Sequence, residues 1–296
     1  MVVRVETPYT QRARYYSSAD AFNIKRPEIP AHLFRAERDR AFAADAPSGL
    51  IPLDLSAELE IPFPATTPLI LARYGRIRAG ARLAPRFEAS GEMYYVMRGA
   101  GESHLGDDVI GWEAGDAFCL PGGSSAVHTA RQDSLLWIVT NEPQLAYEGA
   151  RVPAPGRAPI EIVHYPGDEI RRRLEWIHSL PTEKTLVGKA INLSSRRLDH
   201  YRTCLPSFTL SMNSLARGDD QRPHRHNAVA VTLVVQSARC HSMIDGRRVD
   251  WEPDTVMITP PGAMHSHHND GDELALFLIV QDGGLYYHCR TMGFAY

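Results

Sequence analysis

The sequence contains little cysteine. Its four thiols, Cys119, Cys204, Cys240 and Cys289, are scattered without CxxC spacing, so they give no pattern for a disulfide framework. They are typical of reduced thiols in the cytoplasm, where we expect the protein to be located. No stretch approaches the roughly 20 apolar residues of a membrane-spanning helix. The start of the chain, MVVRVETPYTQRARYY, also lacks the apolar core of a secretory signal.

Neither positive nor negative charge is in large excess. The formal net charge of the 296 residues is −3 and the isoelectric point is near 6.5. We therefore expect neither a nucleic acid nor a membrane as a partner. The hydrophobic content of 44% is ordinary for a globular protein, and the length allows one large or two moderate domains.

Short runs rich in β-branched and aromatic residues dominate the chain. Examples are YYVMRG, LLWIVT, AVTLVVQ and LALFLIVQ, and turn signals such as Asp245-Gly246 separate runs of this kind. Helical patterns are few: one follows Pro30 (residues 31–44) and one begins at Asp168 (residues 168–180). The sequence therefore predicts an all-β protein in which a short helix links two β domains.

An internal repeat supports two copies of one β domain. The pairs separated by 139 residues are Trp112 and Trp251, Glu113 and Glu252, Pro121 and Pro260, and Gly123 and Gly262. Slightly upstream the offset is 138 and pairs Gly80 with Gly218. The same offset would align Arg86 with His224 and Glu88 with His226.

The segment RPHRHNAVAVTLVV (222–235) carries the first chemical signal. In an extended chain His224 and His226 face the same side while Arg225 faces the other. Two imidazoles on one face are half of a metal site. Taken alone, the pattern fits equally well a surface HxH or two hydrogen-bonded histidines at a barrel rim.

Two longer patterns resemble the paired motifs of the cupin superfamily. The first is Gly218 followed by His224-Arg225-His226, and the second is Pro260, Gly262, His265 and Asn269. The resemblance implies two tandem jelly-roll β-barrels, a bicupin. The expected division is an N-terminal arm with a helix (1–58), a degenerate, metal-free barrel (59–150), a linker with a helix (151–200) and a metal-binding barrel (201–296).

Within the bicupins, the chain resembles the gentisate 1,2-dioxygenase group. The similar stretches are PATTPLILARYGRIRAGARLAP, RPHRHNAVA, DGRRVDWEPDTVMITPPGAMH and MHSHHND. The resemblance implies one Fe(II) per chain, held in the C-terminal barrel by His224, His226 and His265. Zn, Mn or Ni are alternatives, because three imidazoles suit these metals as well.

The usual cupin glutamate after HxH is absent, since Ala230 and Val231 occupy its positions. Three histidines leave about three positions open on an octahedral metal, enough for a substrate with two donor atoms and for dioxygen. The resemblance also implies a proton-transfer role for His267. The alternative for His267 is a strand-end histidine that contacts solvent.

The first barrel has lost the histidines in this alignment. Arg86, Glu88 and Ala126 would stand at its ligand positions, so one metal per chain is expected. The gentisate group differs here, because its N-terminal barrel is the principal iron site. It also commonly has tryptophan where this chain has Met264, and often arginine where this chain has Thr232. These departures leave the substrate open.

The resemblance favours a non-haem Fe(II) ring-cleaving dioxygenase, of an extradiol-like type, acting with O₂ on a small aromatic such as gentisate, a salicylate or a hydroquinone. The alternative is a metal-dependent cupin that does not activate O₂, such as an isomerase, cyclase or lyase, or else a non-catalytic ligand-binding bicupin. A homo-oligomer, dimer or tetramer, is expected by analogy.

Overall fold

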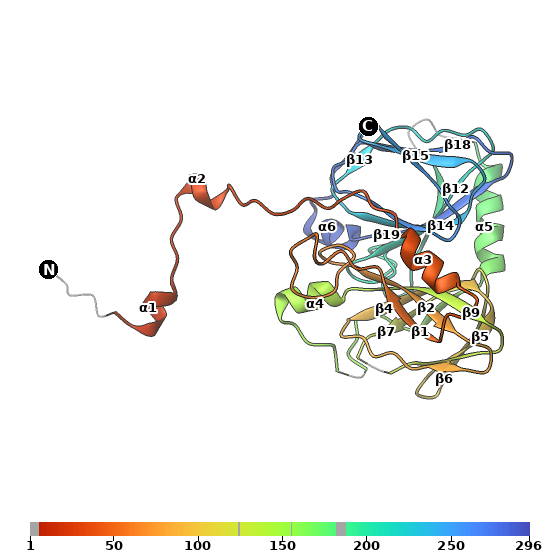
Figure 1. Cartoon of the computed structure of the whole chain (residues 1–296), viewed down its shortest axis with the longest axis horizontal. Helices are drawn as coiled ribbons and strands as arrows, with labels where there is room; N and C mark the ends of the chain where they lie inside the picture. Colours follow the sequence, from red (N-terminus) through yellow and green to blue (C-terminus); the bar gives the residue numbers. More distant parts are fainter. Residues whose placement is uncertain (1–5, 124, 155, 182–187) are drawn as a thin grey trace.

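The protein consists of two stacked β barrels, a helix along their side, and an N-terminal arm that runs away from the body (Figure 1). The computed structural model describes residues 6–123, 125–154, 156–181 and 188–296. The first five residues of the predicted arm, residue 124 of the first barrel, and residues 155 and 182–187 of the predicted linker lie outside the described residues.

The first barrel is built from a six-stranded and a four-stranded antiparallel sheet. The larger sheet has the order β1 (Gly49–Pro52), β2 (Leu71–Ile77), β9 (Ser134–Thr140), β4 (Gly91–Arg98), β7 (Ala117–Pro121), β10 (Val163–Tyr165). The smaller has the order β3 (Arg82–Leu83), β8 (Val127–Ala130), β5 (Ala100–Leu105), β6 (Asp108–Glu113). Strands β1 and β10 come from the predicted arm and linker.

The second barrel repeats this plan. Its five-stranded sheet has the order β11 (Lys189–Leu193), β12 (Thr209–Leu215), β19 (Ala275–Gln281), β14 (Ala230–Gln236), β17 (Val256–Thr259). A three-stranded sheet of β16 (Arg247–Asp250), β15 (Cys240–Ile244) and β18 (His265–Asn269) faces it, with a pair of β13 (Arg225–His226) and β20 (Phe294–Ala295). The predicted all-β bicupin fold is confirmed.

Six helices are found in the described part of the chain. They are α1 (Pro8–Arg12), α2 (Ser18–Ala21), α3 (Arg35–Phe42), α4 (Glu142–Glu148), α5 (Gly167–Ser179) and α6 (Gly283–Cys289). The helix predicted after Pro30 is α3, shorter than its pattern, and the linking helix is α5. None of the helices in the described ranges is long and apolar enough to cross a membrane.

The large sheets of the two barrels pack against each other and share one core. Because side chains alternate along a strand, Val231 and Leu233 of β14 enter this core, whereas Ala230 and Thr232 face the interior of the second barrel. The hydroxyl of Tyr74 in the first barrel donates to the carbonyl of Asp254 in the second, at 2.7 Å. The second barrel therefore presents a separate interior for a site.

Strand pairing shows which residues of the two barrels correspond. Glu92 on β4 lies opposite Thr140 and Leu120, and Ala230 on β14 lies opposite Gln281 and Thr259. Ala230 is thus the counterpart of Glu92, at the offset of 138. At β5 and β15 the offset is 139, since Gly101 lies opposite Trp112 and Trp251 donates to the carbonyl of Cys240.

Candidate metal centre

The structure brings the three predicted ligand histidines together inside the second barrel. His226 lies on β13, and His224, just before it, forms a two-way backbone bridge with His265 at the start of β18, at 2.9 Å in both directions. All three are buried, and their ligand atoms lie within 4.8 Å of one another. Ring centroids are 4.2 Å apart for His224 and His265, and 4.8 Å for His226 and His265.

Backbone carbonyls orient all three imidazoles. The Nδ1 atoms of His224, His226 and His265 lie 3.0, 2.8 and 2.9 Å from the carbonyl oxygens of Arg222, Ala228 and Ala263. A carbonyl oxygen can only accept, so each Nδ1 carries the hydrogen and donates. Each Nε2 therefore keeps its lone pair, which is the form that binds a metal ion.

Burial keeps these imidazoles neutral. It lowers the pKa of His224 to about 4 and that of His265 to about 3, because burial removes the hydration of the charged ring. Burial also lowers the pKa of His226. At neutral pH no proton competes with a metal ion for the three Nε2 atoms.

His267 is buried next to the three histidines, and its ring centroid lies 5.8 Å from that of His265. Its Nδ1 lies 2.8 Å from Ser242 Oγ, and Trp251 Nε1 donates to the same oxygen at 2.7 Å. The serine hydroxyl has one hydrogen and two lone pairs and also lies 3.8 Å from Met257 Sδ, so it is able either to donate to His267 Nδ1 or to accept from it. The contact fits both neutral tautomers of His267, and donation by the serine would place the ring hydrogen on Nε2. Burial holds the pKa of His267 well below the usual value.

The first barrel contains the same Trp–Ser–His network. Trp112 Nε1 donates to Ser103 Oγ at 2.9 Å, and Ser103 Oγ lies 2.7 Å from His128 Nδ1. These residues correspond to Trp251, Ser242 and His267 at the offset of 139. The network is thus part of the shared barrel architecture. Its presence alone assigns no chemical role to His267.

Further polar atoms lie in the second barrel beside the histidines. Gln281 Nε2 is 3.1 Å from His226 Nε2. The buried hydroxyls of Thr232 and Thr259 have no hydrogen-bond partner within the described ranges, and both lie on the inner face of their strands. No motif pointed to Gln281, because its position follows from strand pairing alone. These groups make the interior suited to a polar ligand.

A cleft of about 800 Å³ adjoins the loop that carries the second motif. It is lined by Glu28–Ala31 of the arm, by Ile244, Asp245 and Arg247 of one hairpin, and by Pro260–Ala263. This loop also holds the ligands, because Gly262 N donates to the carbonyl of His226 at 2.7 Å and His265 donates to that of Ala263. Small-molecule sites typically have volumes of about 300 to 1,000 Å³.

The C-terminal segment covers another side of the site, which no sequence pattern indicated. Strand β20 pairs with β13 so that Phe294 lies opposite His226. The ring of Phe294 stacks on that of His224, with centroids 5.2 Å apart and planes at 18°. Two ligand imidazoles therefore lie under this aromatic ring.

The first barrel differs from the alignment at its ligand positions. Arg86 and Glu88 are exposed, whereas the alternating residues of the same segment are buried: Pro85, Phe87 and Ala89. A displacement of one residue reverses the face of an extended segment, so the offset of 138 does not hold locally. The inward residues here are apolar and supply no ligand atom, and Ala126 corresponds to His265.

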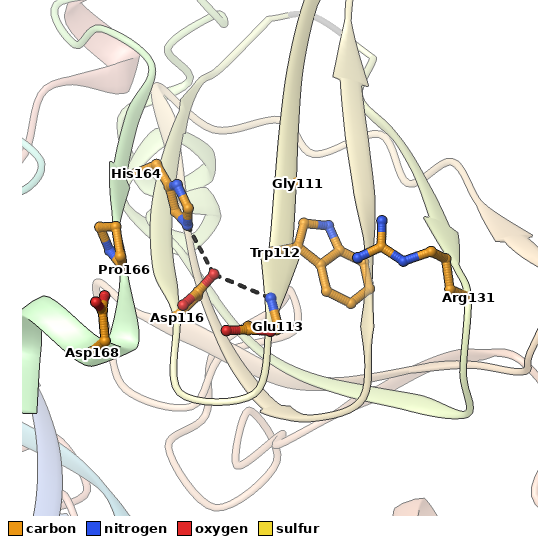
Figure 2. A pocket seen from close by; sticks show the side chains of 8 residues that line it. All are labelled: Gly111, Trp112, Glu113, Asp116, Arg131, His164, Pro166 and Asp168. Carbon is orange, nitrogen blue, oxygen red and sulfur yellow. Dashed lines mark hydrogen bonds and ion pairs between the residues drawn. The ribbon is translucent and has the colours of Figure 1, made fainter.

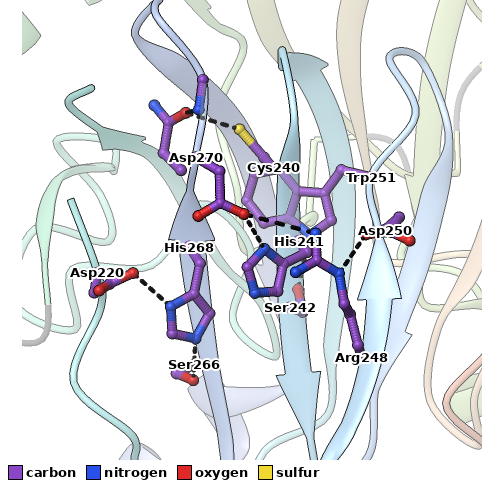
Figure 3. A network of polar contacts seen from close by, with 12 residues as sticks. Asp220, Cys240, His241, Ser242, Arg248, Asp250, Trp251, Ser266, His268 and Asp270 are labelled. Atoms are coloured by element: carbon purple, nitrogen blue, oxygen red, sulfur yellow. Dashed lines mark hydrogen bonds and ion pairs between the residues drawn. The ribbon is translucent and has the colours of Figure 1, made fainter. Parts of the chain in front are cut away.

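Two other polar clusters have structural roles. Beside α5, a hollow of about 280 Å³ contains Asp116, which accepts from Gly167 N at the start of α5 and lies 2.9 Å from His164 Nε2 (Figure 2). On the second barrel, the rings of His241 and His268 stack at 4.6 Å and contact Asp270 and Asp220 (Figure 3). The first joins the linking helix to its barrel, and the second joins β15 to β18.

Comparison with known proteins places the second barrel in a known class. Residues 212–281, which include all four histidines, match the family model of the cupin domain. A gentisate 1,2-dioxygenase of Ralstonia sp. is 32% identical over 82 residues, which are 28% of this chain and 23% of that protein. One from Haloferax sp. is 32% identical over 59 residues, or 20% of this chain and 16% of that protein. The matches span less than a quarter of these relatives.

Solved structures extend the similarity to the whole fold. A salicylate 1,2-dioxygenase from Pseudaminobacter salicylatoxidans has a TM-score of 0.76 and 13% identity, covering 98% of this chain and 93% of that one. The oxalate decarboxylase of Bacillus subtilis, described with Mn(II) centres, has a TM-score of 0.54 and 16% identity, covering 78% and 72%. The chain therefore has the two-barrel fold of these solved structures, and its second barrel matches the cupin domain and resembles the gentisate 1,2-dioxygenases.

Proposed function

We propose that the protein is a metal-dependent dioxygenase that cleaves the ring of a small hydroxylated aromatic compound with O₂. His224, His226 and His265 would hold one Fe(II) in the second barrel. The observation that carries this proposal is the shared orientation of the three imidazoles, whose Nδ1 atoms all donate to carbonyl groups. Nothing in the folding of a jelly roll requires three convergent lone pairs.

The chemistry of the donor set fits this assignment. Three neutral imidazoles bind iron, zinc, manganese or nickel, and the missing carboxylate leaves positions for a substrate with two oxygen donors. Bound iron would supply the electron transfer between an electron-rich phenol and dioxygen that ring cleavage requires. The choice of an aromatic substrate and of O₂ is supported by the curated relatives, which are gentisate 1,2-dioxygenases, and the choice of iron follows from the resemblance of the motifs to that group.

The residues of the chain would bind the substrate, shield it from water and exchange a proton with it. In the tautomer with the hydrogen on Nε2, His267 would donate to a phenolic or carboxylate oxygen of the substrate and exchange a proton with it. The cleft beside Pro260–Ala263 is large enough for a single aromatic ring. The buried setting of the histidines excludes bulk water from the reacting atoms.

The first test is the metal content of protein purified without oxygen, for the wild type and for His265→Ala. We expect about one iron per chain in the wild type and near zero in the variant, because a third of the donor set is removed. Oxygen uptake with gentisate, salicylate and hydroquinone then tests the reaction. Zinc, manganese or nickel at this stoichiometry, without oxygen uptake, would favour a cupin enzyme that does not activate O₂.

The N-terminal arm supports the proposal of a homo-oligomer. Residues 6–27 extend from the body (Figure 1) and expose five large apolar side chains: Tyr9, Tyr15, Tyr16, Phe22 and Ile24. Exposed apolar side chains of this number mark an interaction surface, and a second copy is the simplest partner. Light scattering of the full chain and of a variant lacking residues 1–27 tests this, with a smaller particle expected for the variant.

A further inference from the structure

The C-terminal strap, defined as residues 291–296, is attached to the ligand segment at several points. Its strand β20 pairs with β13. Asn227, directly after His226, forms two further hydrogen bonds with the strap. The Asn227 side chain donates to the carbonyl of Thr291 at 2.8 Å and accepts from Gly293 N at 3.0 Å. The strap is therefore hydrogen-bonded directly to the segment that carries His226.

A second attachment lies on the other side of the HxH segment. The guanidinium of Arg222 lies 3.9 Å from the centre of the Tyr296 ring, a cation–π contact. Arg222 also supplies the carbonyl that orients His224. The two residues that hold the strap, Arg222 and Asn227, thus lie within two positions of His224 and His226 in the sequence.

Phe294 separates these histidines from solvent. His224 and His226 are only 5% and 4% exposed, whereas Phe294 is 45% exposed. Its ring centroid is 5.2 Å from that of His224 and 6.2 Å from that of His226. The outer face of the two imidazoles is therefore covered by one aromatic ring on a two-residue strand.

We propose that Phe294 closes the solvent side of the three-histidine site, where it retards metal release. The inference rests on the proposed metal centre. A short strand with few contacts opens locally far more often than a barrel strand, so the strap is able to open without unfolding the barrel. Loss of the ring would leave the same donors but expose them to water and to chelators.

The test loads the wild type and variants with Co(II), whose absorption reports the ligand set, and follows metal loss to excess EDTA. Since an aromatic contact changes an equilibrium by up to about tenfold, we expect Phe294→Ala to lose metal about ten times faster. Asn227→Ala should act in the same direction, because it frees the strap. Phe294→Leu should be intermediate, because it keeps part of the apolar cover.

The matched control is Tyr147→Ala, which removes an aromatic ring that is 79% exposed on α4 of the first barrel. It should lose metal at the wild-type rate. Thermal unfolding of each metal-free variant checks that the barrels remain folded. If Co(II) leaves the wild type and Phe294→Ala at the same rate, the strap proposal is overturned alone. If the wild type binds no metal, both proposals are overturned.

Discussion

The two barrels share a scaffold and differ at the end where the ligands lie. Both contain the Trp–Ser–His network, at Trp112, Ser103 and His128 and at Trp251, Ser242 and His267. The first barrel has kept an inward glutamate and has no ligand histidines, whereas the second has kept the histidines and has Ala230 in place of Glu92. The two barrels thus differ in which polar side chains point into this end of the interior.

In the first barrel, Arg73 and Glu92 find their partners within the chain. Arg73, which is buried, pairs with Glu142 at 2.5 Å and lies 4.6 Å from the centre of the Phe87 ring. Tyr94 donates to Glu92. A guanidinium from the chain supplies the positive charge at this end of the barrel. In the second barrel the Nε2 atoms of three neutral imidazoles converge instead, an arrangement that could hold a metal ion.

The largest expected difference concerns the two histidines of the shared network. His267→Gln should lower kcat about 100-fold, the usual size of a general acid–base contribution, whereas His128→Gln should leave kcat unchanged. Both substitutions break the contact with a network serine, so their effects on stability should be similar. Oxygen uptake at saturating substrate, with equal metal content, makes the measurement. Equal kcat values for the two variants would show that His267 is purely structural.

Much of this comparison could be predicted from the sequence. The repeat follows from residue type and spacing, and the resemblance to the paired cupin motifs singled out the three histidines that the structure brings together. Which side of the segment Arg86 and Glu88 face could not be predicted. A register shift of one residue exchanges the inward and outward side chains, and the sequence does not show such a shift. Phe294 lies 68 positions beyond His226, and only strand pairing brings it to the site.

A carboxylate can be restored to the second barrel to test the comparison further. Ala230→Glu would place a carboxylate opposite Gln281, which contacts His226. We expect metal affinity to rise about tenfold and oxygen uptake to fall, because an open coordination position is lost. Isothermal titration with Co(II) and oxygen uptake are the two measurements.

The control for this variant lies in the first barrel. Glu92→Ala removes the corresponding carboxylate there and should change neither quantity. Lower affinity in Ala230→Glu, with the fold intact, would mean that this position does not face the metal.

The smallest expected effect is an opposite dependence of the stability of the two barrels on pH. Folded His224 takes up a proton only near pH 4, whereas the unfolded residue does so at its ordinary pKa of 6.5. The metal-free second barrel should therefore lose stability as pH falls from 6.5 towards 4. Burial raises the pKa of Glu92 to about 8 from an ordinary 4.5. Its contribution is present below pH 4.5 and is lost as pH rises through 8.

Thermal unfolding midpoints of the metal-free chain between pH 4 and 8 test both signs. The two pH ranges overlap between 4.5 and 6.5, so each contribution is taken from the difference between the wild type and one variant. Glu92→Gln cannot ionise, so it should remove the loss of stability as pH rises from 4.5 to 8 and leave the acid decline in place. His265→Ala removes a histidine whose pKa is lowered in the same way as that of His224, so it should weaken only the acid decline. If either variant altered the pH dependence assigned to the other barrel, the stabilities of the two barrels would be coupled through the shared core.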